Sequence, residues 1–573
     1  MSEEQSFMKA AFFGVVAEEL IFPFPALSRE EKDGLRALLE QLRRFLDAEV
    51  DSAAIDRNRE ISDRVLGELR EFGLYGLGVP EQYGGTGLGQ TAHARVIQEL
   101  AAADASLGLM LATHGAIAAR SLVTFGSAEQ KQRYLPRLAT GELLGAFALT
   151  EHASGTDAAT IRTEARYDDE AKVWRLSGTK PWVTNGDRAG LITVFARTSR
   201  PDQGHKPRLT AFLVERAPGV ESGRQHKTLG VRGVAVTPVH FDEVVLGPEA
   251  VLGEVGKGYK VAMAVLNDAR LVLSAAMFGQ ARAIINRIVS HVQERRSFGR
   301  VIGEFPILKD KVAKMMADAF AVESMTYLTT GLADRGVEDY SLESGICRIA
   351  SVEALWRVVN EAMQIVAGRG YVETDALERH LRDARVGFVL DGTNETLRCF
   401  VALAGLRGPG EKLAEVESAM YEPLKSFGLL RRFAPQKLRE ALRRERLTRA
   451  HPLLAREVVM FEEATEALHQ SATRALKDHG REIAEMQYTQ KRLANVAIDL
   501  YALAACLSRA SAAIASRGEG GARREIDLVT MFATAAQGRM RAHLGRLEHN
   551  DDELRKEIAA RTYTDKGYPF DVF

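Results

Sequence analysis

The chain has 573 residues, of which 46% are apolar and 27% charged, and its formal net charge is −1. This length exceeds what one ordinary hydrophobic core fills, so we expect two to four domains of a folded globular protein. The near-neutral charge argues against a globally basic nucleic-acid binder, although it is compatible with a local basic patch.

The cysteines and the apolar runs of the sequence indicate the cellular compartment in which the protein works. Cys347, Cys399 and Cys506 are widely spaced and form no CxxC pair, so we expect neither a zinc site nor a disulfide framework, and a reducing environment fits. We find no apolar run of the ~18 residues that span a bilayer. The early run "AAFFGVVA" follows acidic residues, unlike a signal or transit peptide. These features favour a cytoplasmic bacterial enzyme.

The first part of the chain, residues 28–140, has the apolar spacing of helices. Leu35, Leu38 and Leu42 lie on one face at this spacing. The stretch "VPEQYGGTGLG" interrupts the pattern and superficially suggests a phosphate-binding loop. No strand of a βαβ unit precedes it and no Lys-Ser/Thr pair follows it, so we predict a turn between helices.

The middle of the chain has a different residue composition from the first part. Between about 145 and 250, β-branched and aromatic segments such as "LITVFART" and "RLTAFLVER" are separated by turn residues, which predicts a β domain. Helical spacing returns from Lys257, a linker with "RGPGEK" follows, and a further helical region extends to about residue 560. Grouped strands argue against a Rossmann fold and favour an α+β, mainly α, fold. The predicted domains are 1–144, 145–255, 256–406 and 407–573.

Six ordered segments resemble the signature segments of acyl-CoA dehydrogenases. They are "FALTEHASGTD", "KPWVTNG", "ERRSFGR", "QIVAGRGY", "ERHLRDARV" and "DGTNETLR". The resemblance covers essentially the whole chain, and the tail with "QKRLANVAIDLYALAACLSRAS" is similar to the extra C-terminal domain of the very-long-chain branch. It implies a helical domain, a small β domain and a helical bundle, with FAD at their junction and at a homodimer interface.

The resemblance also implies a reaction, the α,β-dehydrogenation of an acyl-CoA thioester. In the family a carboxylate removes the α proton, the β hydrogen leaves as hydride to the flavin, and electrons pass to an electron-transfer flavoprotein. Asp391 occupies the position of the catalytic carboxylate, and the resemblance implies that its backbone amide and a flavin ribityl hydroxyl hold the thioester oxygen. Gly392 is expected to let the chain pass close to the substrate.

This chain departs from the family at the catalytic position, because the usual residue is Glu and Asp391 is one methylene shorter. Some members place their Glu at the position of Ala269, which cannot act as a base. Asp268 is adjacent but points about 100° round the helix. The alternative for Asp391 is a polar residue at a helix start, a role that suits Asp.

The expected cofactor contacts fall into three groups that the resemblance implies. Residues along the flavin ring are Phe147, Leu149, Thr150, Thr156, Trp182, Val183 and Thr184. Residues that reach the FAD of the neighbouring subunit are Arg295 and Phe298. Residues on the pyrophosphate and adenosine side are Gln364, Gly368, Thr393 and Glu395. The family often has Gly-Gly where this chain has Ala367 and Gly368.

On the substrate side, Arg270 matches an arginine near the thioester, Asn267 a CoA contact, and Thr156 a hydroxyl beside CoA. Ala118 and Ser121 match the pocket floor, where small residues permit a long acyl chain.

Residues 425–456 contain ten Lys or Arg interleaved with Leu and Phe. Such a basic amphipathic segment can lie on an anionic membrane surface or simply be a solvated helix. Three functions remain open: a long- or very-long-chain acyl-CoA dehydrogenase, an FAD-binding scaffold or assembly protein with little catalysis, and another flavoenzyme, such as an oxidase or an enzyme that acts on unusual CoA esters. We expect no nucleic-acid partner and no metal.

Overall fold

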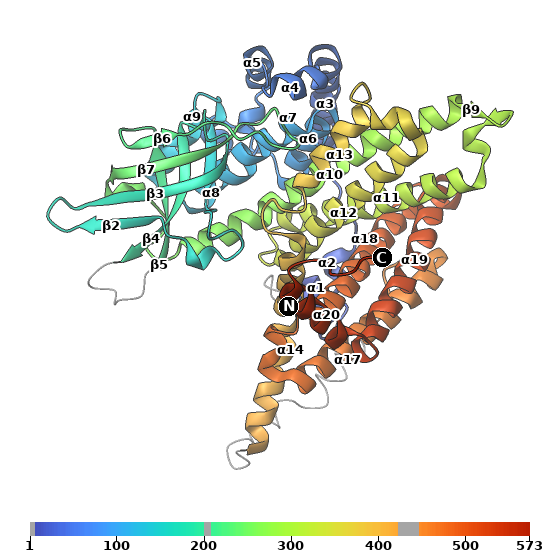
Figure 1. Cartoon of the computed structure of the whole chain (residues 1–573). Coiled ribbons are helices and arrows are strands. Elements are labelled where there is room, and N and C mark those ends of the chain that lie inside the picture. Colours follow the sequence, from blue (N-terminus) through green and yellow to red (C-terminus); the bar gives the residue numbers. More distant parts are fainter. Residues whose placement is uncertain (1–5, 200–207, 422–445, 573) are drawn as a thin grey trace. The chain divides into compact units, whose positions relative to one another are not determined.

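The computed structural model describes residues 6–199, 208–421 and 446–572. Contacts divide the chain into two compact units (Figure 1). One unit comprises Phe24–Leu397, and the other combines Gln5–Pro23 with Arg398–Phe573. The N-terminal segment therefore packs with the C-terminal helices and not with the predicted domain 1–144.

The first unit begins with a helical layer. Its helices are α3 Arg29–Glu49, α4 Ser52–Asn58, α5 Asp63–Glu71, α6 Gln90–Ala103, α7 Ala105–Leu111, α8 Arg120–Phe125 and α9 Ala128–Ala139, and the π-helical segment Ala112–Ala119 joins α7 to α8. Helix α3 starts at a capping box in which Ser28 and Glu31 bond each other's backbone N–H groups. Its apolar stripe, with Leu42 buried at the centre, faces the core.

The glycine-rich stretch forms the predicted turn between helices. It ends at Gly89, directly before α6, and the backbone N–H groups of Gln90 and Thr91 donate to the Asp334 carboxylate at 2.5 and 3.0 Å. A Cβ at Gly89 would lie 2.7 Å from an oxygen of this carboxylate. A helix N-terminus attracts anions, and here a side chain of the protein takes that place.

Strands then form an eight-stranded sheet in the order β6-β7-β3-β2-β4-β5-β8, with β1 pairing with β4. The strands are β1 Gly145–Ala148, β2 Glu164–Asp168, β3 Val173–Thr184, β4 Leu191–Ser199, β5 Arg208–Glu215, β6 Val220–Ser222, β7 Val236–Leu246 and β8 Val251–Leu252. Pairing is antiparallel except for β1–β4 and β2–β4. Buried Trp174 packs edge-on against Phe212 at 5.6 Å between ring centroids, at the sheet's core.

The last layer of this unit is a helical bundle. It contains α10 Gly258–Glu294, α11 Pro306–Asp334, α12 Ser341–Val366 and α13 Ala376–Val386, and the short hairpin of β9 Arg296–Ser297 and β10 Arg300–Val301 leads from α10 to α11. Helix α14 Asn394–Tyr421 follows, and its residues from Arg398 onward belong to the second unit. The order of helical layer, sheet and bundle confirms the fold predicted from sequence.

The second unit is helical. The helices α1 Phe7–Phe12, α2 Glu18–Ile21, α17 Ala455–His479, α18 Gln487–Gly521, α19 Arg523–Glu548 and α20 Asp552–Asp565 lie in it. The early apolar run is buried here, with Ala10, Phe12 and Val16 at most 3% exposed. Just before it, the Phe7 ring lies 6.4 Å from that of Phe461 and 6.0 Å from that of Tyr501. Ser508 also donates to the carbonyl of Ile21.

Among the residues that the structure describes, three helices are long and apolar enough to cross a membrane by length and composition alone, contrary to the sequence expectation. They are Ala105–Phe125, Gly258–Glu294 and Gln487–Gly521, and 67%, 83% and 78% of their most apolar windows are buried within the protein. A helix buried on nearly all sides is apolar all round, so packing in a large core accounts for this composition.

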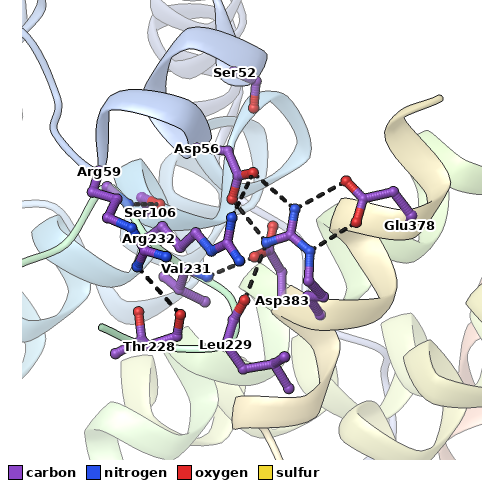
Figure 2. A network of polar contacts seen from close by, with 12 residues as sticks. Ser52, Asp56, Arg59, Ser106, Thr228, Leu229, Val231, Arg232, Glu378 and Asp383 are labelled. Carbon is purple, nitrogen blue, oxygen red and sulfur yellow. Dashed lines mark hydrogen bonds and ion pairs between the residues drawn. The ribbon is translucent and has the colours of Figure 1, made fainter. Parts of the chain in front are cut away.

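A network of charged groups fixes α13, the helix that precedes Asp391. The Arg382 guanidinium donates hydrogen bonds of 2.8 to 2.9 Å to the carboxylates of Asp56 on α4 and Glu378 on α13 (Figure 2). Beside it, buried Asp383 accepts from the backbone N–H of Val231 at 2.5 Å. The network thereby joins α13 to the first helical layer and to the loop between β6 and β7.

Asp383→Asn is expected to gain stability over the wild type as pH rises. Burial, aided by the nearby Asp104 carboxylate, raises the pKa of Asp383 to about 7. The stability due to the protonated carboxyl is therefore present below about pH 4 and is lost as pH rises through about 7. Urea unfolding at about pH 5.5 and pH 8 checks this, with exposed Asp310→Asn as control. A difference independent of pH would contradict it.

Candidate active site

Asp391 lies in the turn between α13 and α14, three residues before the first residue of α14. Helix α14 begins at Asn394, and its cap is Thr393, whose hydroxyl accepts from the Thr396 N–H at 3.3 Å. Asp391 itself has φ +62° and Gly392 has φ +93°. A left-handed conformation is uncommon for a residue with a Cβ, and the side chain that caps α14 is that of Thr393 rather than that of Asp391.

The Asp391 carboxyl is enclosed by protein. Its side chain is 8% exposed, and Oδ2 lies 3.7 Å from Nε of Arg270 on α10. Oδ2 has no hydrogen-bond partner among the described residues. Burial raises the pKa of Asp391, while the charges of Arg270 and Arg348 oppose that shift. A carboxylate so desolvated is more basic than one in water, which is what proton abstraction requires.

Arg348 on α12 is a member of this site that the sequence analysis missed. It is fully buried, and its Nη2 donates to the carbonyl oxygens of Gly387 and, at 2.6 Å, Leu390. Both carbonyls belong to the turn that presents Asp391. The available signal was an arginine inside the apolar run "GICRIASVEALW", where a charge is expensive unless it has partners.

The other polar residues on α10 divide into two groups. Arg270 donates from Nη1 to Asn267 at 3.1 Å, so these two predicted substrate contacts lie together beside Asp391. Asp268 instead accepts from Arg120 at 2.5 Å and from Tyr340. Asp268 is thus engaged elsewhere and does not share the Asp391 site, in agreement with the helical angle.

A second group of predicted residues lies on the β sheet around β1 and β3. Trp182 is 49% exposed, and its ring stands edge-on to His152 at 5.0 Å. Thr184 follows on the same face of β3, whereas Val183 is buried on the other. An indole exposed on a strand, with hydroxyls nearby, is a surface that suits a flat aromatic ring.

The loop after β1 is held by a buried ion pair. Nζ of Lys180 donates to the Leu149 carbonyl at 2.9 Å and to Glu151 at 2.8 Å. Glu151 also accepts from the N–H groups of Arg162 and Thr163, at 2.6 and 2.9 Å. These contacts fix the segment that contains Leu149 and Thr150. Of the other predicted residues here, Phe147 is half-buried and its ring lies tilted against that of Phe195, and Thr156 is exposed.

The residues predicted for a neighbouring subunit's cofactor lie on exposed positions of this unit. Arg295 directly follows the last residue of α10, and Phe298, 94% exposed, lies at the tip of the β9–β10 hairpin. Arg270 and Arg295 are roughly 37 Å apart along α10, at about 1.5 Å per residue. Gln364, Gly368 and Glu395 are also exposed. One chain therefore does not bring Arg295 and Phe298 to Asp391, and their role across a dimer remains a prediction.

Ala367 adopts a backbone conformation that favours glycine, with φ +58° and ψ −141°. The adjacent Gly368 has no atom within 4 Å of where its Cβ would lie, so its surroundings are open. Where the family often has two glycines, this chain therefore has its one methyl group on Ala367, the residue with the strained backbone.

Ala367→Gly is expected to stabilise the protein by about 1 kcal/mol, because it removes strain of about 1–3 kcal/mol and adds a smaller chain-entropy cost. The change in urea midpoint measures it. Ala350→Gly, in the middle of α12, is the matched control and should lose stability. A loss of stability in the Ala367 variant would show that the conformation is not strained.

The two predicted pocket-floor residues lie on the helical segment that faces the sheet. The Ala118 methyl would sit 2.5 Å from a Cβ at Gly145, so these two residues are in close contact. The Ser121 hydroxyl donates to the Ala118 carbonyl at 2.7 Å and contacts the Thr193 hydroxyl at 3.1 Å. Both residues are buried against β1 and β4.

Two further sequence features can be placed only in part. Of the basic segment 425–456, residues 425–445 lie outside the described residues; of its remaining cations, Arg449 bonds the Phe22 carbonyl and pairs with Glu18. Within residues 6–199, 208–421 and 446–572, no group of three His, Cys, Asp or Glu side chains is arranged to hold a metal ion.

Comparison with known proteins shows which family has this arrangement of domains. Residues 32–142, 146–244 and 256–406 match the N-terminal, middle and C-terminal domains of acyl-CoA dehydrogenases, and residues 452–568 match the ACAD9/ACADV C-terminal domain. The very long-chain specific acyl-CoA dehydrogenases of Macaca fascicularis and Homo sapiens are 38% and 37% identical, covering 96% of this chain and 85% of each relative.

Solved structures agree. An acyl-CoA dehydrogenase complexed with FAD from Bacillus anthracis has a TM-score of 0.80 at 27% identity, covering 98% of this chain and 96% of that chain. Butyryl-CoA dehydrogenase from Megasphaera elsdenii has a TM-score of 0.62 at 29% identity, covering 66% of this chain and 99% of that chain. The cofactor of this fold is FAD, and the exposed Trp182 face with its hydroxyls fits the flavin ring.

Proposed function

Because this chain belongs to the acyl-CoA dehydrogenase family, as an FAD-dependent oxidoreductase, we propose that it converts long- or very-long-chain acyl-CoA to the trans-2-enoyl-CoA, with Asp391 as the base. The observation that supports this most is the buried Asp391 carboxyl beside Arg270. Two charged groups enclosed in a helical bundle are costly unless they have a function or are fully compensated.

In the proposed reaction Asp391 takes the α proton of the thioester onto a carboxylate oxygen. Its raised pKa strengthens the base, and the exclusion of water keeps the developing enolate in a low dielectric. The backbone N–H of Asp391 makes no backbone hydrogen bond among the described residues and is a suitable donor to the thioester oxygen. FAD, when bound, supplies the acceptor for the hydride that leaves the β carbon. Trp182, Thr184 and Thr150 would hold its ring.

The preference for long chains is supported by the similarity to very long-chain specific enzymes and by the small side chains of Ala118 and Ser121. Anaerobic titration of the purified holoenzyme with C4 to C22 acyl-CoAs tests it. Bleaching of the flavin absorbance should occur with the long chains and be weakest with C4. A preference for short chains, or no bleaching with any chain length, would reject the proposed substrate class.

We also propose that electrons pass to an electron-transfer flavoprotein, that the protein forms at least a homodimer, and that it acts in the bacterial cytoplasm, with peripheral membrane contact through residues 425–456. The resemblance to the family supports the electron acceptor and the homodimer. The basic, leucine-rich sequence of residues 425–456 supports the membrane contact.

Arg295→Ala is expected to weaken FAD retention about tenfold, because a cationic contact to the pyrophosphate across the dimer would be lost. Fluorescence titration of the apoprotein with FAD measures the dissociation constant. The neighbouring Arg296→Ala is the control, since Arg296 bonds the Gly299 carbonyl within its own hairpin. Equal dissociation constants for wild type and the Arg295 variant would count against this placement.

A scaffold protein is the second candidate, because Asp391 is shorter than the family's Glu. A base displaced by about 1 Å can lower a rate by about a hundredfold. Such a protein would bind FAD and remain yellow in the titration with every acyl-CoA. An oxidase would be bleached without oxygen and would form hydrogen peroxide in air.

A further inference from the structure

Arg348 is the most deeply buried cation of the proposed site. It is 0% exposed on α12, between the equally buried side chains of Cys347 and Ile349. Its Nη2 donates to the carbonyls of Gly387 and Leu390. Nε and Nη1 are buried without a hydrogen-bond partner among the described residues.

Such an arrangement is costly for stability, because a buried guanidinium normally requires that its donors be satisfied. Burial lowers the pKa of Arg348 to about 10, and the side chain therefore stays charged at neutral pH. A methionine would fill a similar volume without this cost. The positive charge of Arg348 therefore does not serve the stability of the fold, and we look for its role in its effect on neighbouring groups.

Two buried arginines are the charged groups that act on the Asp391 carboxyl among the described residues. Arg270 approaches it from α10 and Arg348 from α12, and both act against the effect of burial on its pKa. The next carboxylate on α12, Glu353, accepts from Asn394 at 3.4 Å, at the start of α14. Asp383 on α13 is bonded to Val231.

Arg348 also holds the backbone that presents Asp391. Its two carbonyl partners, Gly387 and Leu390, precede Asp391 by four residues and by one. Bonds at both ends of this short segment restrict the rotation of the peptide planes, including the one that leads into the positive φ of Asp391. A side chain thus supports a conformation that a residue with a Cβ adopts at a cost.

We propose that Arg348 is a positioning residue for the catalytic base: it clamps the Asp391 turn through two carbonyls and, as a second buried cation beside Arg270, keeps the Asp391 carboxylate ionised. The inference rests on the proposed function of Asp391 and adds a residue that touches neither substrate nor cofactor. It also offers a reason why a short base can serve here, because a fixed turn limits the displacement of the carboxylate.

The first test is the pH dependence of flavin bleaching by a C16 acyl-CoA in the holoenzyme. The bleaching rate falls at low pH as the base is protonated. In Arg348→Met this acidic limb of the pH–rate profile should move up by about one pH unit, because the ionised fraction of Asp391 falls. At a pH on the limb, the variant should therefore bleach about tenfold more slowly than the wild type. Arg348→Lys keeps the charge and a donor for the carbonyls, so it should restore the limb. Arg357→Met, an exposed arginine of the same helix, is the control.

The second test needs no substrate. Urea unfolding is measured at several pH values for the wild type, Arg348→Met, Asp391→Asn and the double variant. At pH 8 the loss caused by Arg348→Met should be smaller in the Asp391→Asn background, where no carboxylate remains, and this coupling should fade as pH drops and Asp391 is protonated. If acyl-CoA fails to bleach the wild type, the proposed function is wrong, and the unfolding cycle still decides the inference. Coupling near zero at all pH values, or an unchanged limb in Arg348→Met, would overturn it.

Discussion

Asp391→Asn is expected to lower the rate of flavin bleaching by a long-chain acyl-CoA by about 10²–10⁴-fold, the usual contribution of a general base. The asparagine has nearly the same size and fits the same turn, which already has φ +62° and for which Asn is well suited. It cannot accept the α proton. FAD absorbance of the purified variant should therefore be unchanged, and stopped-flow bleaching measures the loss.

Asp391→Glu is the matched companion. The added methylene restores the length of the family's usual base, so a dehydrogenase with a short base should keep or raise its rate. A site built around Asp for another CoA ester would be crowded, and its rate would fall. If both variants bleach as fast as the wild type, Asp391 is not the base.

Lys180→Met is expected to lower the free energy of unfolding by about 3–5 kcal/mol, the range for removing one partner of a buried ion pair. Lys180 is completely buried and the Glu151 side chain is 7% exposed. Burial opposes the charge of Glu151, yet hydrogen bonds from Lys180, Thr163 and Arg162 hold its pKa at about 2. Without Lys180 this carboxylate would be charged, buried and short of a partner.

The double variant Lys180→Met, Glu151→Gln isolates the pair. It removes both charges, so it should recover a large part of the lost stability. FAD retention should fall in the single variant, because Lys180 also bonds the Leu149 carbonyl on the proposed flavin face. Exposed Lys309→Met is the control. An unfolding midpoint for Lys180→Met equal to that of the control would show that the pair is not needed.

The layers of the fold could be predicted because each leaves a periodic pattern. Helical spacing before residue 140, β-branched runs from 145 to 250 and helical spacing again after 257 all correspond to the observed elements. The family motifs placed Asp391, Arg270 and Asn267 in one region, and the structure brings these three side chains together.

Contacts between distant residues could not be predicted from such patterns. Arg348 bonds carbonyls 39 and 42 residues further along the chain, and Asp334 caps a helix that starts 244 residues before it. A backbone carbonyl has no residue-specific signature, so nothing in the sequence identified the turn as the partner of Arg348. The packing of Phe7 against Phe461 and Tyr501 is equally long-range.

The most direct test of α,β-dehydrogenation is the mass of the product formed from a C16 acyl-CoA deuterated at both hydrogens of C2 and of C3. Under anaerobic conditions the holoenzyme should yield one trans-2-enoyl-CoA for each flavin bleached, and the product should have lost one deuterium from each carbon. Asp391→Asn should form almost none. Recovery of the intact substrate, with the flavin still yellow, would contradict the account.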